Sequence, residues 1–572
     1  MLSRLKLFAR KSKEFRAWRL IPATLITMYK RFVSFLLLFP ICLVSMIISA
    51  QGQGAPGPAN PATAQVAQAS VPQAADQSPI AKAEQLYRTG KLAEAAQEYN
   101  ALLQAEPKSV MAYVGLVHVY LRQKKPSEAY SAAAKAIELA PSLDAAHVAL
   151  GEACFRQGKL SDAEKEFANL IKAKTKEPRA YLGLWRVYTA ATYFKQAKVM
   201  IDRAYSLDPK DPDIRSAWAR TLTREERIKE LKAYLSSDVG EDAEERERLE
   251  RYIAVLEDEA GRPMRPCRLA TKLGPMETNL EQLLRDPTHI RGYGLRVKLN
   301  GASSRLLLDT GASGILVNRK IAEKAGIQRV LEQKVRGVGD KGPASGYIGY
   351  ADSIKIGDLE FKDCYVEVVD KNPIGEDGLI GADVFSRFLV DIDFPNSKFR
   401  LSPLPPRPDE SATPVALESR STGVRQFYDP YVAPEMKSFT PVFRFGHNLL
   451  IYTRLNDLPP KLFLIDTGAF SNTISPAAAR EVTKVSSDSD LKVRGLSGSV
   501  KNVFRADELT LQFGHLRQKN LDIVAFDTKA ISDADGTEVS GFLGFAMLRM
   551  LRIRIDYRDG LVDFEFDRNR FH

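Results

Sequence analysis

The chain has 572 residues, of which 44% are apolar, and a formal net charge of +11. This length predicts several domains, each with its own core, and the composition is that of an ordinary globular protein. Residues 1–50 hold nine Lys or Arg and one acid, which accounts for +8 of the charge and leaves +3 for everything after them, so the sequence argues against nucleic-acid binding, which needs a basic stripe on a folded domain.

The first predicted element is an apolar segment over residues 32–49, within a basic N-terminal region over residues 1–50. The segment FVSFLLLFPICLVSMIIS carries no charge and directly follows Lys30 and Arg31, which is typical of a secretory signal peptide or a signal anchor that tethers the chain to a membrane. Its 18 residues are borderline for crossing a bilayer and Pro40 weakens the anchor, so both interpretations stay open. In either case the basic residues predict that the rest of the protein lies outside the cytoplasm.

The long basic start suggests a further hypothesis, that synthesis begins at Met28 and gives the apolar segment a conventional short basic start. Detection of a peptide from residues 1–27 in the precursor would contradict it. Residues 51–78 follow, and because they are rich in Gln, Ala, Gly and Pro they predict a disordered linker.

Residues 79–212 contain an internal repeat. Four alanines recur every 34 residues, at Ala95, Ala129, Ala163 and Ala197. The motifs GKLAEA, KPSEAY, GKLSDA and YFKQAK recur around them, and successive units are predicted to end at Pro107, Pro141, Pro178 and Pro209. This period and pattern resemble four tetratricopeptide (TPR) units, which are helix pairs that stack into an all-α solenoid.

Residues 213–260 predict highly charged helices that cap the stack, and residues 261–285 predict a linker with Pro and short apolar pieces. Resemblance to TPR arrays implies a concave surface that binds a peptide or protein partner. The alternative is a spacer that holds the C-terminal half away from a membrane.

The C-terminal half is organised around two similar stretches. LLLDTGASGILV (Leu306–Val317) is matched by LFLIDTGAFSNTI (Leu462–Ile474), and their Asp-Thr-Gly triplets lie 157 residues apart. Aliphatic residues lead into each Asp-Thr-Gly triplet, so Asp309 and Asp466 are each predicted to end a buried strand where the chain turns.

Three more matches follow in the same order. VRGVGD at Val335 corresponds to VRGLSG at Val493, GLIGADVF to GFLGFAML, and VDIDF to IRIDY. An internal duplication explains them, with one β-rich lobe over residues 286–404, a Pro-rich linker over 405–434 and a second lobe over 435–572.

These motifs resemble the aspartic proteases of the retropepsin and pepsin type, whose lobes carry hydrophobic-hydrophobic-Asp-Thr-Gly, a glycine-containing flap and a later hydrophobic-hydrophobic-Gly. Within this family, the closer resemblance is to bacterial retropepsin-like proteins that join such lobes to helical repeats. The resemblance implies a TPR solenoid followed by an all-β bilobal protease domain, a polypeptide substrate, no cofactor or metal, and a location in the bacterial periplasm or cell envelope.

The predicted catalytic pair is Asp309 and Asp466. Two adjacent carboxylates that share one proton can activate a water and also donate a hydrogen bond to the substrate carbonyl. Glycines at the third position of each triplet permit close backbone approach, and by resemblance the threonines lock the two loops together. The predicted supporting residues are Thr310, Gly311, Thr467 and Gly468.

Two glycine-containing segments fall where the family has its flaps, and a flap would cover an extended substrate. The predicted flap residues are Gly337, Val338, Gly339, Gly495, Leu496 and Ser497. The alternative is that both are ordinary hairpin turns.

The motifs Ile380-Gly381 and Leu543-Gly544 are expected to pack behind the active loops. A supporting hydroxyl is expected to be missing from lobe 2, where Phe470 stands in the place of Ser313.

Other residues suggest no second chemistry. The sequence has no HExxH, GxSxG or P-loop motif, and His447 and His515 are expected at strand ends or on the surface. The four cysteines lie far apart without CxxC spacing, which argues against a zinc site or a disulfide framework. Cys154 and Cys364 are therefore expected to be small buried thiols.

Two alternatives to an intramolecular protease remain. The lobes and repeats could form a non-catalytic scaffold that only binds peptides or proteins. The lobes could also pair between two chains, although a duplication within one chain favours intramolecular pairing.

Overall fold

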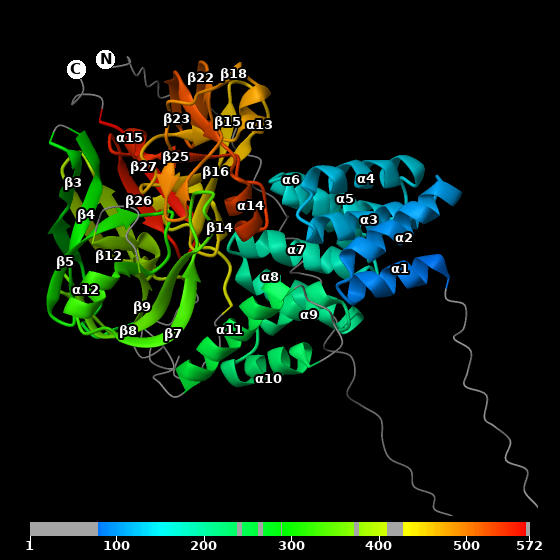
Figure 1. Ribbon diagram of the computed structural model, residues 1–572, viewed down its shortest axis with the longest axis horizontal. Coiled ribbons are helices and arrows are strands. Elements are labelled where there is room, and N and C mark those ends of the chain that lie inside the picture. Colours follow the sequence, from blue (N-terminus) through cyan, green and yellow to red (C-terminus); the bar gives the residue numbers. More distant parts are fainter. Residues whose placement is uncertain are drawn as a thin grey trace, which may run out of the picture. The chain divides into compact units, whose positions relative to one another are not determined.

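The computed structural model describes residues 78–236, 243–260, 267–287, 289–370, 377–408 and 427–567. Within these ranges an α-helical region precedes a β-rich region (Figure 1), which confirms the predicted order of an all-α repeat array and an all-β bilobal domain. The predicted apolar segment 32–49, Met28, Cys42 and all of the predicted linker 51–78 except Ser78 lie outside the described residues. No described helix is both long enough and apolar enough to cross a membrane.

The helical region consists of antiparallel pairs followed by three further helices. Its members are α1 (Pro79–Arg88), α2 (Leu92–Ala105), α3 (Val110–Arg122), α4 (Pro126–Leu139), α5 (Asp144–Arg156), α6 (Leu160–Lys172), α7 (Pro178–Ala190), α8 (Phe194–Leu207), α9 (Pro212–Ala219), α10 (Arg224–Leu235) and α11 (Ala243–Ala260).

The recurring alanines lie on the second helix of each pair, at the crossing with the first, and all four are buried. Space at these crossings is limited: a Cβ on Gly151 of α5 would lie 2.6 Å from the Phe167 ring of α6. Small residues are thus what the helix packing requires. One detail differs from the prediction, because Pro178 is the first residue of α7 and does not end the preceding unit. Proline is favoured there because the first turn needs no N–H donor.

Lobe 1 is a nine-stranded sheet with two short helices. It comprises β1 (Arg268–Leu269), β3 (Glu281–Asp286), β4 (His289–Leu299), β5 (Ala302–Asp309), β6 (Ile315–Asn318), α12 (Arg319–Lys324), β7 (Gln328–Val335), β8 (Ala344–Ile356), β9 (Leu359–Val369), β10 (Gly378–Gly381) and η2 (Ala382–Phe385).

Lobe 2 is a ten-stranded sheet with a separate two-stranded hairpin. It comprises β14 (Phe443–Phe445), β15 (Asn448–Leu455), β16 (Lys461–Asp466), β17 (Thr473–Ile474), α13 (Pro476–Arg480), β18 (Val485–Ser487), β19 (Arg494–Gly495), β20 (Gly498–Ser499), β21 (Val503–Ala506), β22 (Leu509–Phe513), β23 (Leu516–Asn520), β24 (Ile523–Phe526), α14 (Lys529–Asp535), β25 (Gly541–Gly544) and α15 (Phe545–Leu548).

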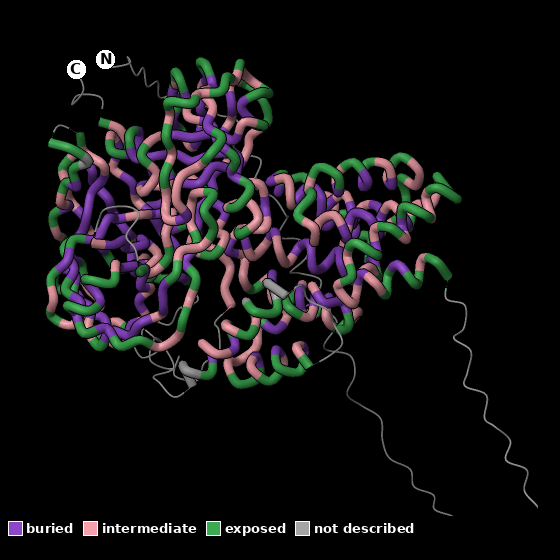
Figure 2. The backbone as a smooth tube through the Cα atoms, viewed as in Figure 1, coloured by how far each residue is buried: buried purple, intermediate pink, exposed green. Residues whose placement is uncertain are grey.

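The two lobes repeat one topology around their Asp-Thr-Gly strands. β10 runs parallel to β5 and antiparallel to β6, and β25 runs parallel to β16 and antiparallel to β17. The register places Gly381 opposite Asp309 and Gly544 opposite Asp466. The hydrophobic-hydrophobic-Gly motifs therefore lie beside the acidic strand ends, as predicted, and the strands around them are buried (Figure 2).

A six-stranded sheet joins the lobes. Its members are β2 (Met276–Asn279), β11 (Phe388–Asp393), β12 (Lys398–Pro403), β13 (Thr440–Pro441), β26 (Arg552–Asp556) and β27 (Leu561–Glu565), with η5 (Pro434–Met436) before β13. β11 of the first lobe pairs with β26 of the second, and the Arg552 guanidinium donates two hydrogen bonds, of 2.9 and 2.7 Å, to the Asp391 carboxylate across this pair. Lobe pairing is thus built within a single chain.

The prediction of a free thiol at Cys364 is wrong, because Cys364 forms a disulfide with Cys267. β1 pairs with β9 and places Arg268 opposite Lys362, which brings the preceding Cys267 beside Cys364. The sequence separation of 97 between the two cysteines hid this pairing from the spacing argument. Cys154 is a buried free thiol, as predicted.

The helical array packs directly against lobe 2. The carbonyls of Phe155 and Arg156, at the end of α5, accept hydrogen bonds of 2.7 Å from the Thr537 hydroxyl and 2.9 Å from the Glu538 amide. The Thr192 hydroxyl, in the turn after α7, donates to the Asp559 carbonyl at 3.1 Å. One hydrophobic cluster contains buried side chains from α5–α7 together with residues of β14–β16, β24 and β25, so the repeats and lobe 2 share part of their core.

Candidate active site

Asp309 and Asp466 end β5 and β16, and each carboxyl is held by the backbone that follows it. Oδ1 of Asp309 accepts from the Gly311 amide at 2.9 Å. Oδ1 of Asp466 accepts from the Gly468 amide at 2.8 Å and from the Ala469 amide at 2.9 Å. These local bonds fix the direction of both side chains.

The two threonines interlock the loops from opposite lobes. The Thr310 amide donates to Oγ1 of Thr467, and the Thr467 amide donates to Oγ1 of Thr310, both at 3.0 Å. Each hydroxyl in turn donates across the lobes, Thr310 to the Ile465 carbonyl at 2.7 Å and Thr467 to the Leu308 carbonyl at 2.9 Å. Because both threonines are buried, these bonds are shielded from water and hold the acidic loops in one relative position.

The glycines of the triplets bring the two carboxyls face to face. A Cβ on Gly311 would lie 2.8 Å from Cγ of Asp466, and a Cβ on Gly468 would lie 2.3 Å from Oδ2 of Asp309. Each carboxyl therefore occupies the space that a side chain on the opposite loop would need. The predicted pair and its four supporting residues are together in the structure.

This arrangement raises the pKa of both carboxyls. Burial raises the pKa of Asp309 well above its usual range, and the charge of Asp466 and a hydrogen bond from Asp309 to Asp466 add to the effect. Burial also raises the pKa of Asp466, but the amide donors of Ala469 and Gly468 and the hydrogen bond from Asp309 oppose it. The two carboxyls titrate together, so the shared proton belongs to the pair.

The hydrogen bonds around the pair differ between the lobes. The Ser313 hydroxyl donates to Asp383 at 3.1 Å, and Asp383 also accepts from the Gly314 amide at 2.9 Å. In lobe 2, Phe470 stands at the place of Ser313 with 47% of its surface exposed, and Oδ1 of Asn472 accepts from the Gly544 amide at 2.9 Å. The sequence comparison found the missing hydroxyl but gave no sign of Asp383 or Asn472, whose partners are distant in the chain.

The two predicted flap tips contact each other. The Ser497 amide donates to the Val338 carbonyl at 3.0 Å, and the Gly337 amide donates to Oγ of Ser497 at 3.1 Å. Leu496 packs against a lobe 1 cluster that includes Ala312 of the Asp309 loop, and Val338 packs with a cluster that includes Ala469 of the Asp466 loop. The structure thus brings together all six predicted flap residues, Gly337, Val338, Gly339, Gly495, Leu496 and Ser497.

One functional candidate was missed. His447, in the turn between β14 and β15, places Nε2 3.3 Å from the carbonyl oxygen of Gly311 in the opposite lobe. It was expected at a strand end, and it is at one, but that strand end lies against the candidate site. His515 is exposed, as expected.

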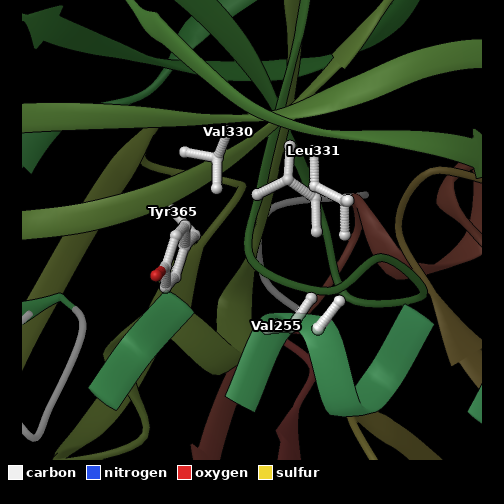
Figure 3. Close-up of a pocket in the computed structure, with 6 residues that line it drawn as sticks. Val255, Val330, Leu331 and Tyr365 are labelled. Atoms are coloured by element: carbon white, nitrogen blue, oxygen red, sulfur yellow. The ribbon is translucent and has the colours of Figure 1, made fainter. Parts of the chain in front are cut away.

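A small apolar cavity lies elsewhere in the molecule. Figure 3 shows Val255 of α11 facing Val330, Leu331 and Tyr365 of lobe 1, and the cavity volume is about 120 Å³. None of its lining residues belongs to the predicted site. Among the residues that the structure describes, no group of three or more His, Cys, Asp or Glu is placed to hold a metal ion.

Fold and site together define a bilobal aspartic-protease domain, and comparisons with known proteins agree. Residues 295–384 and 451–547, which contain Asp309 and Asp466, match an aspartyl protease family model. Residues 80–144 and 120–184 match tetratricopeptide repeat models. The chain therefore carries an aspartyl protease domain and TPR repeats.

Curated relatives match either part. The chain is 29% identical over 109 residues to UBA domain-containing protein Mud1 of Schizosaccharomyces pombe (19% of this chain, 32% of that protein). It is 28% identical over 162 residues to DNA damage-inducible protein 1 of Neurospora crassa (27% and 36%). It is 32% identical over 92 residues to DnaJ homolog subfamily C member 3 of Bos taurus (16% and 18%). The chain thus spans about a third or less of the length of these relatives.

Among solved structures, the aspartic proteinase from Irpex lacteus is 12% identical to the chain, with a TM-score of 0.32. The match covers 51% of this chain and 98% of that one.

Proposed function

We propose that the chain is an aspartic endopeptidase that hydrolyses peptide bonds of a polypeptide with a water held by Asp309 and Asp466. The observation that carries this proposal is how the two carboxyls are placed. The Asp466 carboxyl occupies the space beside Gly311, and the Asp309 carboxyl occupies the space beside Gly468. Two half-buried carboxyls this close cannot both ionise near neutral pH, so one proton is shared.

The roles of the two residues follow from that shared proton. The ionised member accepts a proton from water, and the oxygen of that water forms a bond to the scissile carbonyl carbon. The protonated member donates to the carbonyl oxygen, where negative charge develops. The tetrahedral intermediate then collapses: the C–N bond breaks, the proton taken from water passes to the leaving nitrogen, and the carboxyl pair is left with its one shared proton. Asp309 suits the donor role because burial and the charge of Asp466 raise its pKa more strongly. Asp466 suits the base role because two backbone amides favour its ionised form.

The flaps supply the substrate-binding part of the proposal. Their tips pack over the acidic loops of opposite lobes, so they must separate to admit a chain and can then close on it. Backbone groups at the tips, such as those of Gly337 and Ser497, would then bind an extended polypeptide as an added strand does.

The experiment compares Asp309→Asn and Asp466→Asn with unaltered protein on casein across a pH window of roughly 3 to 7, chosen around the expected titration of the pair. Each substitution should lower kcat/KM by roughly 10³-fold or more while the circular dichroism spectrum stays unchanged. Asp358→Asn is the matched control, because Asp358 lies exposed in the turn between β8 and β9. A pepstatin-type transition-state mimic should block cleavage.

The opposite result would be equally clear. Binding of casein without mimic-sensitive cleavage anywhere in that pH window would favour the non-catalytic scaffold. Equal turnover by both Asn variants and the unaltered protein would exclude the shared carboxyl pair as the catalytic group.

Two wider parts of the proposal concern partners and location. The TPR matches support a role for the repeats in binding a protein partner. The partner would bind the part of the repeat surface that lobe 2 does not cover.

The disulfide between Cys267 and Cys364 supports a location outside the cytoplasm, because disulfides persist in oxidising compartments. Residues 32–49 would direct export or serve as a membrane tether, and cell fractionation with and without this segment tests that role.

A further inference from the structure

A polar cluster lies beside the Asp309 loop, and the strand register places Arg291 at the lobe 1 position that matches His447 of lobe 2. Its members come from both lobes and are His447, Asp383, Ser313, Tyr557 and Arg444. His447 is the member that crosses from lobe 2 to the lobe 1 loop. A carbonyl oxygen can only accept a hydrogen bond, so Nε2 of His447 carries the hydrogen and donates to Gly311 at 3.3 Å.

The bond reaches the residue that orients the acid. The amide of Gly311 holds Oδ1 of Asp309, and the absent Cβ of Gly311 leaves the space for the Asp466 carboxyl. A donor that fixes Gly311 therefore acts on both members of the pair. Asp383 fixes the same loop further on, through Ser313 and Gly314.

Two members of this cluster, Asp383 and Tyr557, have an alanine or a phenylalanine at the matching position of the other lobe. The 163-residue offset between the duplicated motifs pairs Asp383 with Ala546 and Tyr557 with Phe394. Behind the Asp466 loop, the Tyr293, Phe394 and Phe545 rings pack with centroids 5.4 to 5.8 Å apart. The Phe545 amide donates to the Ala469 carbonyl at 2.7 Å, which ties this aromatic group to the loop. The groups beside the two acidic loops therefore differ, with Asp383 and Tyr557 at one loop and Ala546 and Phe394 at the other.

We propose that His447 is a positioning residue for the candidate dyad. His447 holds the Asp309 loop through Gly311 and gives the two aspartates unequal surroundings. This inference rests on the proposed function, and it assigns His447 no contact with substrate.

The charged groups around His447 give the proposal a pH signature. Burial lowers the pKa of His447, while the carboxylates of Asp383 and Asp466 favour its protonated form and Arg444 opposes it. When His447 gains a second proton in acid, its positive charge lowers the pKa of Asp466. One member of the pair therefore stays ionised at a lower pH than it would without the charge on His447. Loss of His447 should therefore move the acidic limb of the activity profile to higher pH.

The test measures kcat/KM on casein against pH for the full chain carrying His447→Gln or His447→Leu. Gln keeps an N–H donor without a charge, so peak activity should stay within about threefold while the acidic limb moves up by roughly 0.5 to 1 pH unit. Leu removes the donor as well, so the same shift should come with a further loss of at least about tenfold at the peak. His515→Gln in the same lobe should match unaltered protein, because His515 is exposed.

The outcomes separate this inference from the proposed function. An acidic limb that stays in place in His447→Gln overturns the charge contribution of His447, and equal peak activity in His447→Gln and His447→Leu overturns its positioning role. If the unaltered chain cleaves, Asp309→Asn does not, and both His447 variants keep the original profile, only this inference falls. If the unaltered chain does not cleave at all, the proposed function and this inference fall together.

Discussion

The two glycines of the Asp-Thr-Gly triplets define how much room the candidate site has. The side chain that is absent from each glycine is replaced by the carboxyl of the opposite lobe, with a separation of 2.3 Å at Gly468. No real Cβ tolerates that distance to an oxygen, so a methyl group must displace the acid, the loop or both.

Gly468→Ala should therefore lower kcat/KM by about 10²-fold, since small displacements of a catalytic group have costs of that order. The interlocked threonines are untouched by this change, so the melting temperature should fall by only a few degrees. Gly274→Ala is the matched control, because a Cβ there meets no atom within 4 Å. Full activity in Gly468→Ala would mean that the carboxyls are not fixed opposite one another as described.

Some residues of the candidate site could be predicted from the sequence, and others could not. The triplets were predictable because local strand and turn signals end at Asp309 and Asp466, and because the motif occurs twice. His447 was missed because its contact with Gly311 joins positions 136 residues apart. Neither a lone histidine nor a lone glycine predicts such a contact. The Cys267–Cys364 disulfide was missed for the same reason, since pairing of β1 with β9 is a property of the folded sheet.

At the scale of elements, the repeats and lobe 2 are one packed body. Helices α5–α7 bury side chains in the same cluster as the strands of lobe 2. Phe155 at the end of α5 is 7% exposed, and its ring centroid lies 6.1 Å from that of Phe445 on β14. The helix periodicity was visible in the sequence. It left open whether the repeats form a partner surface or a spacer, but it did not predict that they pack on the protease domain.

Phe155→Ala should destabilise the chain by roughly 3 to 5 kcal/mol, because it removes a buried ring and leaves a cavity at the junction. Helical and β-sheet signals should be lost together in the unaltered protein during denaturation with urea and should separate in this variant. Val199→Ala serves as the control, since Val199 on α8 is 58% exposed and should change stability by less than about 0.5 kcal/mol. Coincident and unshifted transitions in Phe155→Ala would show that the junction contributes little.

At the scale of the whole molecule, the central feature is the six-stranded sheet in which β11 and β26 join the lobes. This pairing satisfies the central strands within one chain, so no second copy is needed to bring Asp309 and Asp466 together. The duplicated motifs predicted this pairing in outline, whereas the register of β11 on β26 and the Asp391–Arg552 ion pair came only from the structure.

Activity should accordingly belong to the monomer. Specific activity on casein should stay constant as the protein is diluted from micromolar to nanomolar concentration, and sedimentation velocity should give one species of the mass of a single chain. A specific activity that falls in proportion to concentration, together with a dimer at the active concentrations, would instead place the partner carboxyl on a second copy.

A fused molecule is free of a constraint that binds every homodimer. Where two identical chains form one groove, each substitution alters both walls, and the walls stay chemically alike. Here a change at one codon alters one lobe only, as Ser313 and its lobe 2 counterpart Phe470 already illustrate. The two lobes can therefore diverge until they distinguish the direction in which a bound polypeptide runs.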